Sequence, residues 1–272
     1  GSYGAENVER WQRIGRGVFP SSQRGLVTLH PMGWSWIGEE FRQESWFDFI
    51  GYQSSHGPEP ETYAWIAEGP PAVNWQNEPR LPIINLEPCY EEHKVGGSSR
   101  HFTAHDIRMA MYASLLASPT AGVTYGHASI WPWSLQDETP LDHRGSGISP
   151  PWYERLQTEG ITSVTCLRYL FNSLEWWKLR PAPDLLTNQA QRKAEGRRFT
   201  PASLAIDGSF ALIYLPEGGQ VVLDRRQVDS LPRRCWVNPR TGEWTPIRQL
   251  VSGEVYSAPD EQDWLLWLGQ PG

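Results

Sequence analysis

The chain has 272 residues, which fits one large domain or two smaller ones and suffices for a hydrophobic core without disulfide bonds. Charged residues make up 20% and hydrophobic residues 39%, which excludes a disordered chain, and the net charge of -7 argues against nucleic acid or an anionic membrane as partner. No apolar run approaches the roughly 18 residues of a transmembrane helix. Three cysteines, Cys89, Cys166 and Cys235, are too few for a disulfide framework and lack metal-ligand spacing.

The first part of the chain alternates β-rich runs with helical patterns. Strands are expected at 25–29, 46–50, 81–86 and 122–125. Helices are expected at 6–18, at 59–68, from a cap at Thr103 to about 117, and at 151–178 with Gly160 as a candidate break. Apolar strands that alternate with helices indicate a parallel sheet covered by helices.

Polar and aromatic side chains follow the expected strands at their carboxyl ends. They are His30, Tyr52, Gln53, Glu87 and the segment 125–127. A (β/α) barrel places its active site at this edge; an open α/β sheet also binds ligands there and is the alternative. Because no Gly-rich phosphate loop is present, a nucleotide-binding sheet is not expected.

The composition changes at 181–200, where two prolines precede a polar, basic segment. We therefore expect one unit over residues 1–185 and a second over 186–272. Strands are expected in the second unit at 203–207, 210–215, 220–223, 234–237 and 264–268, the first two joined by a turn at Asp207 and Gly208. Short strands separated by turns indicate an antiparallel β-sandwich.

Glu87 is the sharpest candidate for chemistry, because it ends an apolar strand and is followed at once by Pro88. A retaining glycosidase uses such a rigidly held carboxylate as nucleophile, with a second carboxyl about 5 Å away. The alternative is a glutamate that caps the following loop. Glu91 and Glu92 either bind substrate hydroxyls or form structural ion pairs with neighbouring arginines.

Other classes of site find little support in the sequence. His101 and His105 have helical spacing, but a helix that starts after Thr103 leaves His101 outside it, so no metal site is expected. The sequence contains no Gly-x-Ser-x-Gly motif, so a serine hydrolase is not expected. No cofactor is expected either. The 15 tryptophans suit a carbohydrate cleft, since both indole and sugar rings have apolar faces and polar rims; the alternative is that many of them pack in cores.

Four motifs resemble those of the apiosidase-like glycoside hydrolases: Leu26–Gly33, Trp46–His56, Asn85–Glu91 and Gly122–His127. The tail is similar to the β-sandwich, named for collagen binding, that is usually attached to that family. Its matching segments are Tyr214–Pro216, Trp236–Gly242 and Asp263–Trp264.

The resemblance implies a (β/α)8 barrel that cleaves glycosidic bonds in plant pectin, including bonds to apiose, in a secreted or periplasmic protein. It makes Glu87 the catalytic nucleophile, oriented by His30 and Tyr52. The pocket positions that it implies are His30, Tyr52, Gln53, His56, Tyr90 and His127. In the leading interpretation the tryptophans near strand ends, Trp34, Trp36, Trp131 and Trp133, would stack on sugar, and Glu91 would contact substrate hydroxyls.

One departure from the family pattern is expected to matter. The four strands match only the fifth to eighth strands of the barrel, and the family's acid/base aspartate should precede residue 6, where the chain reads Gly1–Ala5. We therefore expect the C-terminal half of a barrel, completed by a missing N-terminal half or by a second copy of the chain. The leading interpretation is a retaining glycoside hydrolase whose acid/base lies outside this chain. The alternative is a non-catalytic carbohydrate-binding or scaffold fragment.

Overall fold

The computed structural model describes residues 5–20, 25–141, 145–248 and 254–270. The α-helices are α1 (Ala5–Val18), α2 (Gly38–Phe41), α3 (Glu61–Ala67), α4 (Pro70–Asn74), α5 (Ala104–Ala117), α6 (Glu159–Asn172), α7 (Gln189–Ala194) and α8 (Arg225–Val228). The 3-10 helices are η1 (Trp152–Arg155), η2 (Trp176–Lys178) and η3 (Pro183–Leu185). The strands are β1 (Ile50–Gln53), β2 (Ile83–Glu87), β3 (Thr120–Val123), β4 (Leu179–Pro181), β5 (Ala202–Ala205), β6 (Phe210–Leu215), β7 (Gln220–Val222), β8 (Arg233–Val237), β9 (Trp244–Pro246), β10 (Val255–Ser257) and β11 (Trp264–Gly269).

The parallel sheet predicted for the first part of the chain is present, in the order β1-β2-β3. Ile50 lies opposite Ile83, and a register shift after Tyr52 places Gln53 opposite Glu87. Alternate residues of a strand face opposite sides of the sheet, so this shift decides which side chains share a face with Glu87.

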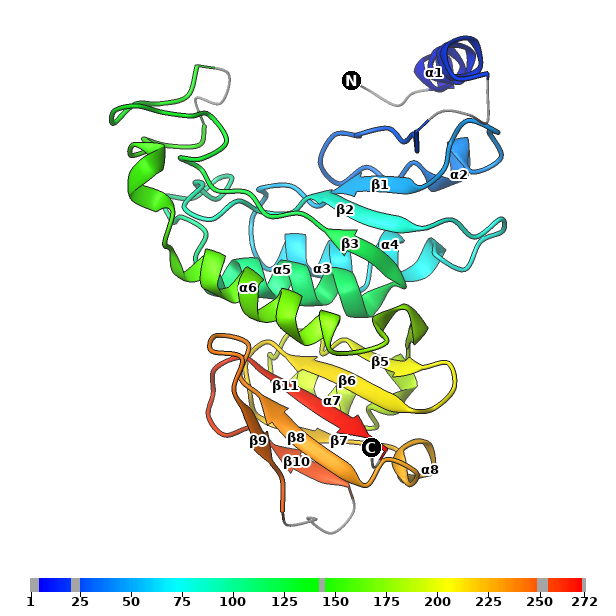
Figure 1. Ribbon diagram of the computed structural model, residues 1–272, viewed down its shortest axis with the longest axis vertical. Helices are drawn as coiled ribbons and strands as arrows, with labels where there is room; N and C mark the ends of the chain where they lie inside the picture. Colours follow the sequence, from blue (N-terminus) through cyan, green and yellow to red (C-terminus); the bar gives the residue numbers. More distant parts are fainter. Residues whose placement is uncertain (1–4, 21–24, 142–144, 249–253, 271–272) are drawn as a thin grey trace.

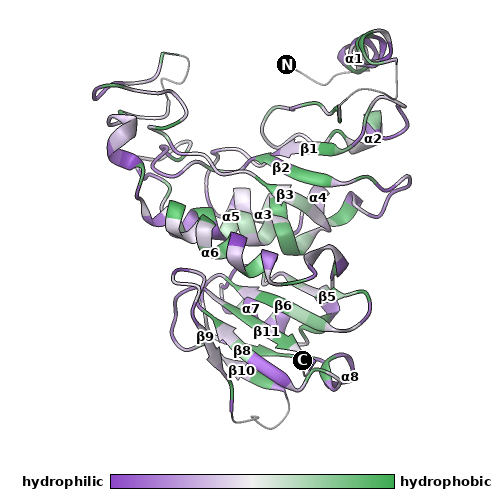
Figure 2. Ribbon diagram, viewed as in Figure 1, coloured by the Kyte–Doolittle hydropathy of each residue, from purple (hydrophilic) through white to green (hydrophobic). Residues whose placement is uncertain are grey.

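Helix α5 lies between the parallel sheet and the C-terminal sheet, with α3 and α6 in the same layer (Figure 1). Its start was predicted correctly, because Thr103 and Asp106 form a capping box that satisfies the first backbone N–H groups. Thirteen of its 14 residues are buried, including Arg108. A helix covered on both sides needs apolar residues all round, and Figure 2 shows apolar colour on α5 and on the strands above and below it.

The C-terminal part forms two antiparallel sheets. One has six strands in the order β4-β5-β6-β11-β8-β9, and the other pairs β10 with β7. One core cluster joins Ile213, Leu266 and Trp236 of the larger sheet to Val221 and Tyr256 of the smaller one. The turn predicted at Asp207 and Gly208 is present, with Gly208 in the left-handed conformation at a φ of 68°. The structure thus combines a parallel sheet, helices and antiparallel sheets.

The strand predicted at 25–29 is wrong. This segment is extended beside β1, but side chains replace part of the strand ladder. The Asp48 carboxylate accepts the N–H of Val27 at 2.6 Å, and Thr28 Oγ1 accepts the N–H of Gly51 at 3.1 Å. Asp48, which needed a partner as an acidic residue among apolar neighbours, thereby obtains one.

Other predicted boundaries shift by a few residues. The strand predicted at 46–50 begins at Ile50, because Trp46 and Phe47 pack as a tight aromatic pair below the sheet, with ring centroids 5.8 Å apart. The single helix predicted at 151–178 is instead η1, α6 and η2, and Gly160 lies in the first turn of α6.

The strand β4 was not predicted and bears on the boundary between the two units. Leu179–Pro181 pairs antiparallel with β5, so these residues belong to the C-terminal sheet. The predicted boundary at 185/186 would cut this strand from its own sheet. We propose instead that the boundary falls at 178/179.

Candidate functional site

Glu87 lies at the carboxyl end of β2, between two histidines. Its Oε1 lies 3.0 Å from His56 Nε2 and its Oε2 lies 3.3 Å from His30 Nε2. The side chain is 17% exposed. The strand end and the two imidazoles therefore restrain the carboxylate while part of it stays open to a ligand.

The hydrogen bonds assign different roles to the two histidines. The backbone N–H of Tyr90 donates to His56 Nδ1 at 3.3 Å, so the proton of this ring lies on Nε2 and is donated to Glu87. His30 Nδ1 lies 3.1 Å from the Pro31 carbonyl, which can only accept, so Nδ1 of this ring carries a proton. The contact of His30 Nε2 with Glu87 is favourable when a proton lies between them. His56 thus donates to one oxygen of Glu87 through Nε2, and His30 contacts the other oxygen through its own Nε2.

Tyr90 follows Glu87 by three residues and borders the same carboxylate. Burial, and after it the negative charge of Glu87, raises the pKa of Tyr90 to about 12. Its ring fills the space beside Gly126, where an added Cβ would lie 2.1 Å from it. Its ring centroid also lies 4.6 Å from that of His56, edge to face. Tyr90 is therefore a neutral phenol that supports His56.

Tyr52 is a correction to the predicted site. Its side chain lies on the face of β1 opposite to that of Gln53, which pairs with Glu87. It is fully buried, and its ring packs against Trp36 and Trp65. Burial raises the pKa of its phenol well above the usual value, and its hydroxyl lies with Asn85 and Ser114. Tyr52 pairs with Asn85 before the register shift, on the face that meets α5, whereas Glu87 pairs with Gln53 after it, so Tyr52 does not face Glu87. His56 occupies the orienting position instead.

Glu91 is also a correction, because its carboxylate holds the start of α6. Oε2 accepts the hydroxyls of Tyr125 and Thr158, each at 2.6 Å, and Oε1 accepts the N–H of Gly160 at 2.8 Å. Only 5% of the residue is exposed. Negative charge at a helix N-terminus is stabilising, and an acceptor engaged three times has little left for a substrate hydroxyl.

His127 is buried beside Glu91 rather than exposed in a pocket. Its Nδ1 accepts the N–H of Ser129 at 3.0 Å, and its Nε2 lies 3.6 Å from Glu92 Oε2. Burial lowers the pKa of His127, although the nearby negative charge of Glu92 opposes this. Glu92 also accepts Arg155 Nε at 3.0 Å and adopts a left-handed φ of 62°, a conformation that is uncommon outside glycine.

The remaining predicted residues lie around the rim of this strand end. Trp34 is 41% exposed, has a left-handed φ of 57°, and packs its ring against Gly57. The backbone N–H of Trp34 donates to the backbone carbonyl of Gln53 at 3.0 Å. Trp131 is partly buried in the turn that follows His127. The structure thus brings His30, His56 and Tyr90 to Glu87, and ties Trp34 to the end of β1.

Sequence reasoning missed His93. Its ring stacks on that of His56 with centroids 4.2 Å apart and planes at 22°. Its Nδ1 lies 2.7 Å from the Lys94 carbonyl. His93 lies only six residues after Glu87, and this short spacing could have drawn attention to it. Nothing in the spacing, however, indicated that its ring stacks on His56.

The residues that the structure describes contain no group of three or more His, Cys, Asp or Glu side chains that could hold a metal ion. Within the same part of the chain, no helix has both the length and the apolar character that crossing a bilayer requires.

Comparison with family models supplies the decisive observation. Residues 1–178 match the model described as "Apiosidase-like, catalytic domain". The chain belongs to the apiosidase-like family. The resemblance read from the four motifs is therefore confirmed. Residues 181–269 of this apiosidase-like chain match a second model, "Putative collagen-binding domain of a collagenase".

Solved structures share the fold of this apiosidase-like chain. A glycoside hydrolase family 5 protein from Bacteroides vulgatus aligns with a TM-score of 0.82 and 19% identity, over 98% of this chain and 60% of its own. A structure titled "Glycoside hydrolase" gives 0.78 and 20%, over 96% and 61%. An α-amylase from Geobacillus thermoleovorans complexed with acarbose gives 0.57 and 11%, over 97% and 58%. No match was found among curated proteins.

The apiosidase-like chain thus spans about 60% of the length of the solved structures that it matches first. At these identities the likeness concerns the fold alone, which is that of glycoside hydrolases.

Proposed function

We propose that this chain carries the nucleophile of a retaining glycoside hydrolase and that Glu87 is that nucleophile. One observation carries the proposal: both carboxylate oxygens are held by imidazole nitrogens, at 3.0 and 3.3 Å, on a side chain that is still 17% exposed. Such restraint keeps an attacking oxygen in place, which lowers the entropic part of the barrier.

In the proposed reaction a Glu87 oxygen attacks the anomeric carbon and forms a C–O bond. The bond to the leaving oxygen breaks, and that oxygen takes a proton from an acid. Water then attacks the glycosyl-enzyme, gives up a proton to the same residue, and restores the Glu87 carboxylate. His56 donates a hydrogen bond to one carboxylate oxygen of Glu87 throughout, while His30 lies against the other oxygen and helps to fix its position.

We propose that the acid/base residue lies outside this chain. The carboxylates that follow Glu87 in the sequence are engaged elsewhere, Glu91 with α6 and Glu92 with Arg155 and His127. A residue about 5 Å from Glu87 would have to come from a neighbouring strand end of a completed barrel.

The parallel sheet supports this proposal. In a closed barrel, apolar side chains of the strands are buried in the barrel interior or under the helices. Here three apolar strand residues are only partly buried: Ile84, Leu86 and Val123. Among the described residues, β3 pairs with β2 alone. We propose that these strands form the C-terminal half of a (β/α)8 barrel and that an N-terminal half, or a second copy, completes it.

We propose plant cell-wall glycans of the pectin type, including those with apiose, as substrates. The name of the matching family model suggests the sugar. The exposed indole of Trp34 beside the end of β1 offers a stacking surface for a sugar ring.

Aryl glycosides with good leaving groups test the nucleophile separately from the acid, because their departure needs little protonation. In the full-length protein Glu87→Gln should lower turnover of such substrates by at least about a thousandfold, while the exposed Glu40→Gln serves as the control. A 2-deoxy-2-fluoro glycoside should label the peptide that contains Glu87, as identified by mass spectrometry. Labelling of another carboxylate, or near-normal turnover in Glu87→Gln, would refute the assignment.

The same experiment decides the second candidate, a carbohydrate-binding fragment without catalysis, which the engaged state of Glu91 and Glu92 favours for this chain alone. If calorimetry shows that both wild type and Glu87→Gln bind the oligosaccharide, and wild type forms no product, the chain is a carbohydrate-binding fragment.

A further inference from the structure

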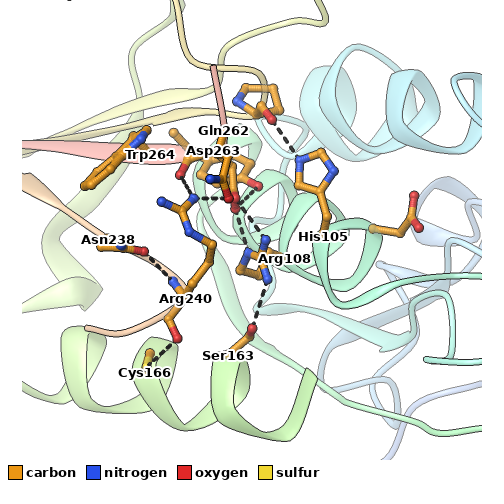
Figure 3. A network of polar contacts seen from close by, with 12 residues as sticks. His105, Arg108, Ser163, Cys166, Asn238, Arg240, Gln262, Asp263 and Trp264 are labelled. Atoms are coloured by element: carbon orange, nitrogen blue, oxygen red, sulfur yellow. Dashed lines mark hydrogen bonds and ion pairs between the residues drawn. The ribbon is translucent and has the colours of Figure 1, made fainter. Parts of the chain in front are cut away.

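Asp263, just before β11, is the centre of a buried polar network (Figure 3). Its Oδ2 accepts Arg108 Nε at 2.7 Å and the Tyr214 hydroxyl at 3.0 Å. Its Oδ1 accepts Arg108 Nη2 at 2.9 Å and Arg240 Nη1 at 2.9 Å. The residue is 1% exposed. Burial acts to raise the pKa of Asp263, but the Arg108 guanidinium outweighs it and holds the pKa below its usual range.

The three segments that mark the C-terminal module all meet the helices of the apiosidase-like unit at this network. From Tyr214–Pro216, the Pro216 carbonyl lies 2.8 Å from His105 Nε2 of α5. From Trp236–Gly242, the Arg240 carbonyl accepts the Cys166 thiol of α6 at 3.8 Å. From Asp263–Trp264, Asp263 binds Arg108 of α5. The arrangement is drawn in Figure 3, where Arg240 also lies beside Trp264, 5.0 Å from the ring centroid.

An apolar contact surrounds the network. The rings of Tyr112 on α5 and Tyr214 on β6 stack with centroids 4.8 Å apart and planes at 24°. One continuous core cluster contains Met109 of α5 together with Leu212 and Leu265 of the C-terminal sheet. Each of these side chains is nearly or fully buried. The two units therefore share one hydrophobic core.

We infer that the residues by which the C-terminal module is recognised form a permanent docking surface for α5 and α6 of the same chain, and that its partner is the apiosidase-like unit rather than collagen. In this contact the side chains of Asp263 and Tyr214 meet α5, and Arg240 meets α6 through its carbonyl while its side chain binds Asp263. For these residues to meet a collagen triple helix, the module would have to leave α5 and expose both the ion pair with Arg108 and the shared core. This inference does not depend on the role of Glu87.

Calorimetric unfolding of the whole chain tests the inference. Wild type should unfold in a single transition. Asp263→Asn leaves Arg108 buried without its charged partner and should lower Tm by roughly 10 °C. The matched control is Asp229→Asn, which removes an exposed ion pair with Arg225 in the same module, where the Asp229 side chain is 67% exposed. Tm of the control should stay within about 2 °C of wild type.

A milder variant keeps the test decisive if Asp263→Asn does not fold. Tyr214→Phe removes one hydroxyl that donates to Asp263 and should lower Tm by roughly 3 °C. Equal Tm values for wild type, Tyr214→Phe and Asp229→Asn would overturn the inference, as would two separate transitions in wild type.

Binding to immobilised triple-helical collagen provides a second readout. Wild type should not be retained at micromolar concentration. Retention of wild type would overturn the inference, and loss of that retention in Arg240→Ala without a change in Tm would locate the collagen contact on this surface. Neither readout involves glycoside hydrolysis, so failure here is distinguishable from failure of the proposed function.

Discussion

The role of Glu91 separates two interpretations that differ in a measurable way. If its carboxylate caps α6, Glu91→Ala leaves three donors without their acceptor: the N–H of Gly160 and the hydroxyls of Tyr125 and Thr158. The buried N–H costs about 1–2 kcal/mol and the two partly buried hydroxyls about 0.5–1 kcal/mol each, so the free energy of unfolding should fall by about 3 kcal/mol.

Glu91→Gln should be much milder. The amide oxygen can still accept the N–H of Gly160, and the hydroxyls can turn to accept from the amide nitrogen. What is lost is the negative charge at the N-terminus of α6, which contributes about 0.5–1 kcal/mol. For a chain of this size the expected changes in Tm are roughly 6–12 °C for Ala and about 1–4 °C for Gln.

Differential scanning calorimetry measures both values. Glu159→Gln is the matched control, since it removes an exposed carboxylate from the same turn of α6. Tm of the control and of the Gln variant should be similar, because each loses one negative charge at this helix end, and Tm of the Ala variant should be clearly lower. If instead both Glu91 variants keep the Tm of the control while KM rises severalfold, Glu91 contacts substrate and the capping argument is wrong.

Three further predictions concern other parts of the chain. Gly126→Ala places a Cβ 2.1 Å from the Tyr90 ring, and by displacing that ring it should lower kcat/KM at least tenfold. The control Gly122→Ala, whose Cβ meets nothing within 4 Å, should keep the kcat/KM of wild type. Equal kcat/KM values for the two variants would contradict this role of Gly126. Burial raises the pKa of Glu59 from 4.5 to about 7, so the folded state binds this proton more tightly than the unfolded state, and the free energy of unfolding falls by up to about 3 kcal/mol as pH rises through that range. Urea titrations should therefore show Glu59→Gln more stable than wild type at pH 8 and equal to it at pH 4; the same difference at both pH values would count against it. Thr103→Ala removes half of a capping box and should cost about 1–2 kcal/mol in the same titration, while Thr103→Ser should cost little; equal loss in both would contradict the capping role.

Local signals predicted the elements that depend on local chemistry. Thr103 and Asp106 marked the start of α5 because a capping box is complete within four residues. Ile83–Glu87 was found because an apolar run stopped by Pro88 has few alternatives. The position of Glu87 at a strand end followed from this, without knowledge of any neighbour.

The errors arose where distant segments decide the outcome. Tyr52 was assigned to the pocket because it ends a β-rich run, but it pairs with Asn85 on the helix side, and the extra residue of β2 after that pair places Glu87 opposite Gln53 instead. The segment 25–29 has the composition of a strand, yet the N–H of Val27 donates to the carboxylate of Asp48, about 20 residues away, instead of to a neighbouring strand. Arg108 and Asp263 are 155 positions apart, and no periodicity connects them.

The start of α6 links the two proposals structurally. Gly160 in its first turn donates to Glu91, in the loop that begins at Glu87, and Ser163 one turn later accepts Arg108 Nη1 at 3.1 Å, with Arg108 in turn bound to Asp263. The loop after β2 contacts this helix directly, and the C-terminal module is linked to the same face of it through Arg108. A module that could swing away would loosen α6, and with it the loop that begins at Glu87. We therefore expect firm docking of the C-terminal module to help keep Glu87 in place.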